Sequence, residues 1–224
     1  MSVHLQREIE NLKKRLLSLC AIVEEQVATA AQALAEGDEE RARAVELRDA
    51  EVDRRDVDLE EDCLQILALH QPVANDLRFV VAVLKINIDL ERIGDLAVNI
   101  ARKAARLAQE HFGVTRFDLA TMWEKTRIML RQSIDALVNC DARLAHQVCA
   151  LDDEVDDMKR EMRLRVEQLL REEPERAHAL LSFLAVPRNL ERISDHATNI
   201  AEDVIFIAEA KDVRHHADQQ EPKP

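Results

Sequence analysis

Four pairs of acidic side chains, each spaced four residues apart, are the residues of this sequence best suited to chemistry. In a helix this spacing places both carboxylates of a pair on one face, about 6 Å apart along the axis. Each pair therefore offers two oxygen donors in one direction. The pairs are Asp49 with Asp53, Glu91 with Asp95, Asp152 with Asp156, and Glu191 with Asp195.

The residue numbers place these pairs at matching levels on neighbouring helices. Residues that lie level in an antiparallel helical hairpin have numbers with a constant sum. The first two pairs share one sum, whose midpoint is Pro72, and the last two share another, whose midpoint lies between Glu173 and Pro174. Proline interrupts a helix, so both midpoints fall on expected turns. With helix axes about 8–10 Å apart, four carboxylates should face one small volume in each half of the chain.

Such a cluster needs a cation, because like charges at this spacing destabilise a helix and each carboxylate disfavours ionisation of the others. Arg92 and Arg192 directly follow Glu91 and Glu191. Adjacent residues lie about 100° apart around a helix, so these arginines can screen the clusters without filling them. A hard or borderline metal ion is the better match for oxygen-only ligands.

We expect one metal site in each half of the chain, holding iron, manganese, magnesium or zinc as one or several ions. Asn99 and Asn199 add an amide oxygen one helical turn beyond the acids. The second acidic segment has two further carboxylates, Asp153 and Asp157, so the two sites are expected to differ in affinity or in the number of ions. The predicted ligands are Asp49, Asp53, Glu91, Asp95, Asn99, Asp152, Asp156, Glu191, Asp195 and Asn199.

Two other interpretations stay open. A carboxylate-bridged, ferritin-like di-metal oxidase would use Glu-x-x-His motifs on two inward-facing helices. The sequence has that spacing at Glu175 and His178, beside a turn, and His196 in the second half has no counterpart at Leu96. The other alternative is a metal-free helical scaffold whose acids form a solvated face. No nucleophile with a paired base stands out and the glycines are scattered, so nucleotide hydrolysis is not expected.

Six long helices are expected to position the acids, and the fold class is therefore all-α. Apolar residues recur at spacings of three and four, and the chain has only 3 glycines and 5 prolines. The expected helices span residues 5–37, 38–69, 74–112, 117–139 and 142–171, with a sixth from the turn at Pro174 to Lys211.

The chain is a tandem duplication. LERIGDLAVNIA at 90–101 and LERISDHATNIA at 190–201 are identical at nine of twelve positions, with an offset of 100 residues. The acidic segments at 49–53 and 152–156 repeat with an offset of 103. We therefore expect two tandem pseudo-symmetric three-helix bundles followed by a disordered polar tail. Their bounds are residues 1–112, 113–211 and 212–224.

Composition excludes several classes of partner. The formal net charge of −13 would repel nucleic acid and anionic lipid headgroups alike. The sequence has no apolar run of membrane-spanning length, so we expect a cytoplasmic protein without direct membrane insertion. The cysteines lack the spacing of a redox or zinc motif and are interpreted as buried small hydrophobic residues. They are Cys20, Cys63, Cys140 and Cys149.

The repeated motifs resemble the twin signature of the PhoU family. The matching segments are LERIGDLAVNI, LERISDHATNIAED, and QPVANDLR at the opening of the third helix. The resemblance extends over nearly the whole chain. It implies two three-helix bundles, acid pairs that bind metal, and a homodimer. The eight acids are ligand candidates by this resemblance as well as by spacing, whereas the two asparagines rest on spacing alone.

The same resemblance implies a regulator and not an enzyme. It implies a protein at the inner face of the cytoplasmic membrane that acts through protein partners in phosphate transport and signal transduction. These partners are the ATPase subunit of a high-affinity phosphate ABC transporter, which it restrains, and a phosphate-sensing histidine kinase, which it keeps inactive when phosphate is plentiful. One departure from the pattern is Pro187, where the sixth helix would lose a backbone hydrogen bond and kink.

Overall fold

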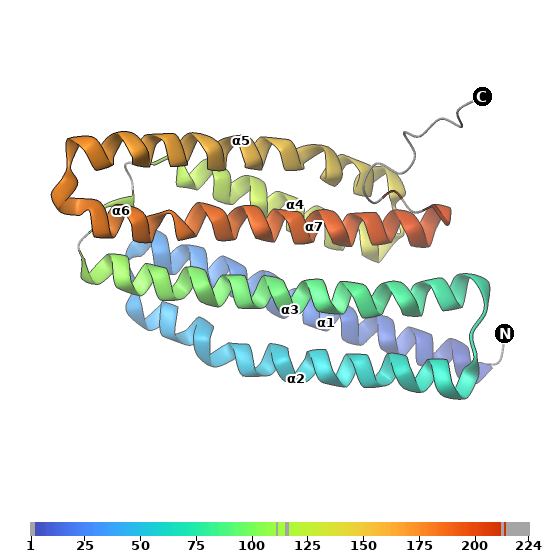
Figure 1. The fold of residues 1–224 in the computed structure, drawn as a ribbon. Coiled ribbons are helices and arrows are strands. Elements are labelled where there is room, and N and C mark those ends of the chain that lie inside the picture. Colours follow the sequence, from blue (N-terminus) through green and yellow to red (C-terminus); the bar gives the residue numbers. More distant parts are fainter. Residues whose placement is uncertain (1–2, 111, 115–116, 212, 214–224) are drawn as a thin grey trace, which may run out of the picture.

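The chain folds into long antiparallel helices, as the spacing of its apolar residues predicts, and the all-α expectation is confirmed (Figure 1). The structure is a computed structural model that describes residues 3–110, 112–114, 117–211 and 213. The helices are α1 (Val3–Glu36), α2 (Glu39–His70), α3 (Ala74–Gln109), α4 (Leu119–Asn139), α5 (Ala142–Glu172), the 3-10 helix η2 (Pro174–Arg176), α6 (Ala177–Phe183) and α7 (Ala185–Glu209).

Aspartate side chains start three of these helices. The carboxylates of Asp38, Asp118 and Asp141 each accept a hydrogen bond from a backbone N–H in the first turn, at 3.0, 3.3 and 3.0 Å. Such caps satisfy N–H groups that have no partner within the helix. Gly37 provides the turn between α1 and α2 with a φ of 66°, a conformation that glycine adopts without strain.

The sixth predicted helix is interrupted at Leu184, which separates α6 from α7. Pro187 explains the position of the break. It has no N–H to donate to the carbonyl of Phe183, so the ladder of backbone hydrogen bonds stops where α6 ends. The predicted loss of a backbone hydrogen bond thus coincides with the break, and the predicted kink stays a prediction.

The two halves of the chain pack against each other through α3 and α7. In Figure 1, α1, α2 and α3 form one unit and α4, α5, α6 and α7 form the other, with α3 and α7 side by side. The apolar stripes expected on these helices are buried, including Leu90, Ile93, Leu190 and Ile193. The rings of Phe117 and Phe183 stack with centroids 4.1 Å apart and join the connection between the halves to α6.

The predicted tail, the boundary between the repeats and the absence of membrane-spanning helices can be compared with the structure only in part. Of the predicted disordered tail, residues 212 and 214–224 lie outside the described residues, and Val213 packs against the core. The domain boundary between residues 112 and 113 stays a prediction. No helix in the described ranges is long and apolar enough to span a membrane.

The interpretation of all four cysteines as buried was wrong for Cys140. Cys20 and Cys63 are buried and Cys149 is partly buried, but Cys140 is exposed. It caps the C-terminus of α4 in the left-handed conformation, with a φ of 49°, and this turn directs its side chain toward solvent.

Polar contacts cross the interface between α3 and α7. The Lys85 ammonium lies 2.8 Å from a carboxylate oxygen of the buried Asp203 and 5.3 Å from the ring centroid of Phe206. On the same interface, Asp89 Oδ1 lies 2.7 Å from His196 Nδ1 and accepts a hydrogen bond from the amide of Asn199 at 3.1 Å. These contacts fix the relative position of the helices that carry the Glu-Arg-Ile motifs.

Replacing Lys85 with methionine should lower the free energy of unfolding by about 2 kcal/mol. The variant keeps the apolar stem but removes the ammonium from a buried carboxylate, and the partial exposure of Lys85 moderates the loss. Urea unfolding would measure the change. Lys14→Met, at an exposed position of α1, is the matched control, with an expected change within about 0.5 kcal/mol. Equal stability of the two variants would contradict the role given to the Lys85–Asp203 pair.

Candidate metal centres

The first carboxylate cluster lies between α2 and α3. Burial raises the pKa of Asp49, and the charges of Asp53 and Asp95 raise it further. Burial likewise raises the pKa of Glu91, with added repulsion from Asp95, Asp56 and Asp53. The acids of the two helices therefore act on one another, as their matching levels predict.

Gln26 of α1 reaches into this cluster. Its side chain is 1% exposed, and its amide nitrogen donates to Asp49 Oδ1 at 3.2 Å and to the Val45 carbonyl at 3.4 Å. Gly94 makes room for it, because a Cβ there would lie 3.3 Å from Gln26 Oε1 and from Val52 Cγ1. Within the described part of the chain, Gln26 Oε1 has no hydrogen-bond donor. A buried carbonyl oxygen without a donor is costly, because it has lost its hydrogen bonds to water.

Asn87 and Asp56 extend the first cluster toward the turn at Pro72. The Asn87 side chain is 2% exposed, and its amide nitrogen donates to the Asp56 carbonyl at 2.9 Å and to Asp56 Oδ1 at 2.6 Å. Its oxygen, like that of Gln26, has no donor among the residues that the structure describes. Two buried amide oxygens thus border the first cluster.

Sequence reasoning missed Gln26 and Asp56 as members of this site. A signal for Asp56 was present, since it lies one turn beyond Asp53 and nearly level with Asn87. Nothing in the spacing on α2 and α3 points to Gln26, which comes from a third helix. Arg92 behaves as expected: it is exposed, and its guanidinium lies 3.4 Å from both Glu91 and Asp95.

The second cluster, between α5 and α7, contains a cation supplied by the chain. The ammonium of Lys159 donates to Asp156 Oδ1 at 2.8 Å and to Glu191 Oε1 at 2.6 Å, and so joins α5 to α7. Asp152 Oδ1 accepts a hydrogen bond from the Thr198 hydroxyl at 3.3 Å. Sequence reasoning did not identify Lys159.

The electrostatics of the second cluster resemble those of the first. Asp195 keeps an exposed edge, but partial desolvation of its carboxyl group raises its pKa to about 6, with further contributions from Glu191, Asp152 and Asp156 and an opposing one from Lys159. Burial also raises the pKa of Asp152. The four predicted acids of this half therefore influence one another as well.

The two predicted asparagine ligands lie outside these networks. Asn99 is exposed, and the Asn199 amide donates to Asp89 across the interface between the halves. Their roles as ligands stay predictions. On α7 it is Thr198, and not Asn199, that contacts the acidic segment of α5.

The two clusters differ in how well their donors suit a metal ion. Among the described residues, no three His, Cys, Asp or Glu side chains are already arranged to hold one. The first cluster nonetheless has oxygen donors of the kind that hard ions prefer, because it combines carboxylates with two buried amide side chains. The nitrogens of these amides donate to Asp49 and Asp56, and their oxygens have no donor among the described residues. The second cluster does not fit, because the Lys159 ammonium already binds two of its predicted ligands.

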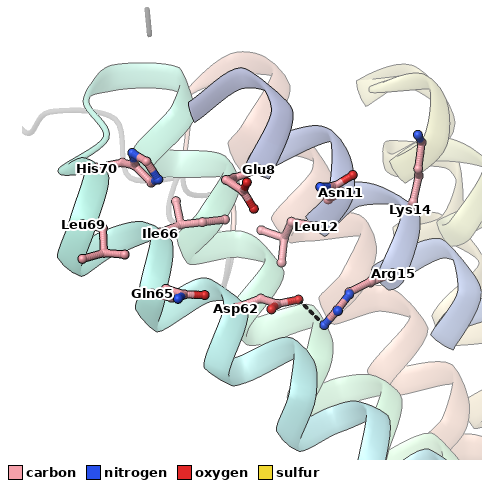
Figure 2. Close-up of a pocket in the computed structure, with 10 residues that line it drawn as sticks. All are labelled: Glu8, Asn11, Leu12, Lys14, Arg15, Asp62, Gln65, Ile66, Leu69 and His70. Carbon is pink, nitrogen blue, oxygen red and sulfur yellow. Dashed lines mark hydrogen bonds and ion pairs between the residues drawn. The ribbon is translucent and has the colours of Figure 1, made fainter. Parts of the chain in front are cut away.

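A hollow elsewhere on the molecule contains none of the predicted ligands. It lies between the N-terminal part of α1 and the C-terminal part of α2, has a volume of about 440 Å³, and is drawn in Figure 2. Its lining includes both signs of charge, and Arg15 pairs there with Asp62 at 2.6 Å (Figure 2). The acidic clusters are thus separate from this hollow.

Fold and clusters together define a duplicated, carboxylate-rich protein of two three-helix repeats. A family model for the PhoU domain matches residues 16–104 and 119–204, one stretch in each repeat. The chain belongs to the PhoU domain family. The resemblance noted from the Glu-Arg-Ile motifs is thereby confirmed.

Relatives and solved structures of this family align along almost the whole chain. A phosphate-specific transport system accessory protein PhoU homolog of Pseudomonas putida is 37% identical over 217 residues, covering 96% of this chain and 84% of that protein. PhoU homolog 1 of Thermotoga maritima is 33% identical over 213 residues, covering 95% and 92%. The crystal structure of PhoU from Pseudomonas aeruginosa superposes with a TM-score of 0.88 at 33% identity, covering 92% of this chain and 99% of that one.

Asp195→Asn should stabilise the metal-free protein at pH 8 by about 1 kcal/mol, after allowance for solvent screening. The folded-state pKa of Asp195 is about 6, above its ordinary value of 3.8, so its charge opposes folding above pH 6. The advantage should fade as the pH falls through 6 toward 4, where the wild-type carboxyl is protonated.

Thermal or urea unfolding at several pH values would measure this difference. Asp157→Asn, on the exposed side of α5, is the control and should change stability little at any pH. A destabilised Asp195→Asn protein at pH 8, or a gain that does not depend on pH, would contradict the repulsion assigned to the cluster.

Proposed function

We propose that this protein is an accessory regulator of a phosphate-specific transport system. The observation that carries the proposal is similarity along 96% of the chain to a relative named as an accessory protein of the phosphate-specific transport system. A solved neighbour from Streptococcus pneumoniae, with a TM-score of 0.85 and 25% identity, is described as a phosphate transport system regulatory protein. Such a protein acts by contact with partners, and long exposed helices provide extended surfaces for that purpose.

The proposed partners are the ATPase subunit of the high-affinity phosphate ABC transporter and the phosphate-sensing histidine kinase. By holding the transporter back and the kinase inactive when phosphate is abundant, the protein would match uptake to supply. Both partners have cytoplasmic portions, so the protein would act in the cytoplasm, attached to the inner membrane through them, as a homodimer. A bound metal ion would stabilise the α2–α3 pairing and the surface that α2 presents.

The alternative of a ferritin-like oxidase has little support from the histidines. His178 Nδ1 lies 3.1 Å from Glu110 and His196 Nδ1 lies 2.7 Å from Asp89, so each pairs outside both carboxylate clusters. A di-metal oxidase would need histidine ligands inside the clusters. Oxygen donors that bind a redox-inert or structural ion agree better with a regulator.

Deleting the gene for this protein should leave high-affinity phosphate uptake and kinase output high in cells supplied with ample phosphate. Uptake of radiolabelled phosphate and a reporter for the kinase's response regulator would measure the two effects. Re-expression of the wild-type chain should restore repression of both. Uptake and reporter activity identical in the deletion and parent strains would contradict the proposed function.

A further inference from the structure

We propose that the two repeats neutralise their carboxylates differently: the first binds a divalent metal ion, and the second uses Lys159 in place of one. The inference rests on the metal binding expected of this protein, but not on its regulatory role. It replaces two equivalent metal sites with one metal site and one internal ammonium.

The Lys159 ammonium takes the position of a bridging cation in the second repeat. It lies 2.8 Å from Asp156 on α5 and 2.6 Å from Glu191 on α7, so it links the same two acidic segments that a metal would link. Hydrogen bonds between an ammonium and carboxylates are short and strong. A divalent ion would have to displace this ammonium while being repelled by its charge.

The duplication identifies the residue of the first repeat that corresponds to Lys159. With the offset of 103 that relates the acidic segments, Lys159 corresponds to Asp56. One repeat therefore has a positive charge where the other has a further carboxylate. Asp56 adds to the repulsion on Glu91, and the exposed guanidinium of Arg92 opposes it from 3.4 Å.

The two repeats also differ in the hydrogen bonding of buried side-chain oxygens next to the carboxylates. With the offset of 100, Gly94 corresponds to Ser194 and Gln26 to Thr126. In the second repeat, the buried Ser194 hydroxyl lies 3.2 Å from two acceptors, Thr126 Oγ1 and the Leu190 carbonyl. In the first repeat, Gln26 Oε1 has no donor among the described residues, although the side chain is 1% exposed.

The repeats differ in the same way at Asn87. Its oxygen also lacks a donor in the described ranges, and its counterpart in the second repeat is Pro187, which has no side-chain oxygen. Carboxylates together with neutral amide oxygens are the ligands that hard divalent ions prefer. The first repeat therefore has buried amide oxygens without donors among the described residues and a further carboxylate in the places where the second repeat has satisfied hydroxyls, a proline and a bridging ammonium.

The direct test compares matched double variants of the full chain. Glu91→Gln/Asp95→Asn removes charge from the first cluster and Glu191→Gln/Asp195→Asn from the second, with almost no change in shape. Each protein, purified without chelating resin, would be dialysed against Mn²⁺ and, in parallel, Mg²⁺, Zn²⁺ or anaerobic Fe²⁺, and bound metal counted by elemental analysis. The metal bound by the first variant should fall to background, and the second variant should bind as much metal as the wild type.

Reciprocal exchanges at the corresponding positions sharpen the test. Lys159→Asp should add metal binding to the second repeat, and Asp56→Lys should abolish it in the first. Lys159→Met, which removes the ammonium without adding a ligand, provides a second route if the aspartate variant does not fold. Circular dichroism would establish that each variant keeps its helices.

Several results would overturn the inference. These are equal loss of metal in both double variants, loss in the second variant alone, no metal bound by the wild type, or no gain in a folded Lys159 variant. Such results are distinct from failure of the proposed function, which the uptake experiment measures. A chain that restores repression of uptake without binding metal would overturn this inference alone.

Discussion

Repulsion among carboxylates held at one level between two helices is the constraint to which much of this structure responds. Folding brings four predicted acids together in each repeat, and partial burial raises the pKa of Asp49, Glu91, Asp152 and Asp195. The apolar stripes beside the acids hold the helices in this register. The repeats must therefore gain a cation or tolerate the repulsion, and Lys159 shows one solution inside the chain.

The helices that carry these clusters also join the two repeats. On α3, Asp89 lies at the interface two residues before Glu91 of the first cluster, and it contacts His196 and Asn199 on α7. His196 directly follows Asp195 of the second cluster. A change in charge at either cluster thus acts on a helix whose opposite face forms the contact between the repeats. This arrangement offers a physical route between a bound ion and the shape presented to a partner.

Much of the fold and the acid pairs could be predicted from the sequence, because helical periodicity, caps and proline positions are local signals. The constant sum of residue numbers placed the pairs level because an antiparallel hairpin with a known turn leaves little freedom. Gln26 and Lys159 could not be found in this way. Gln26 comes from a third helix whose rotation depends on packing, and a lysine in a charged helix resembles an ordinary surface residue until its partner helix is known.

Anomalous diffraction from crystals of the wild-type protein equilibrated with Mn²⁺ would show directly which repeat binds a metal ion. We expect a peak in the first repeat, among the side chains of Asp49, Asp53, Glu91 and Asp95, and an ammonium of Lys159 still bridging Asp156 and Glu191 in the second. Peaks of equal height in the two repeats, with Lys159 displaced, would contradict the division between a metal site and an internal cation. A peak confined to the second repeat would contradict it equally.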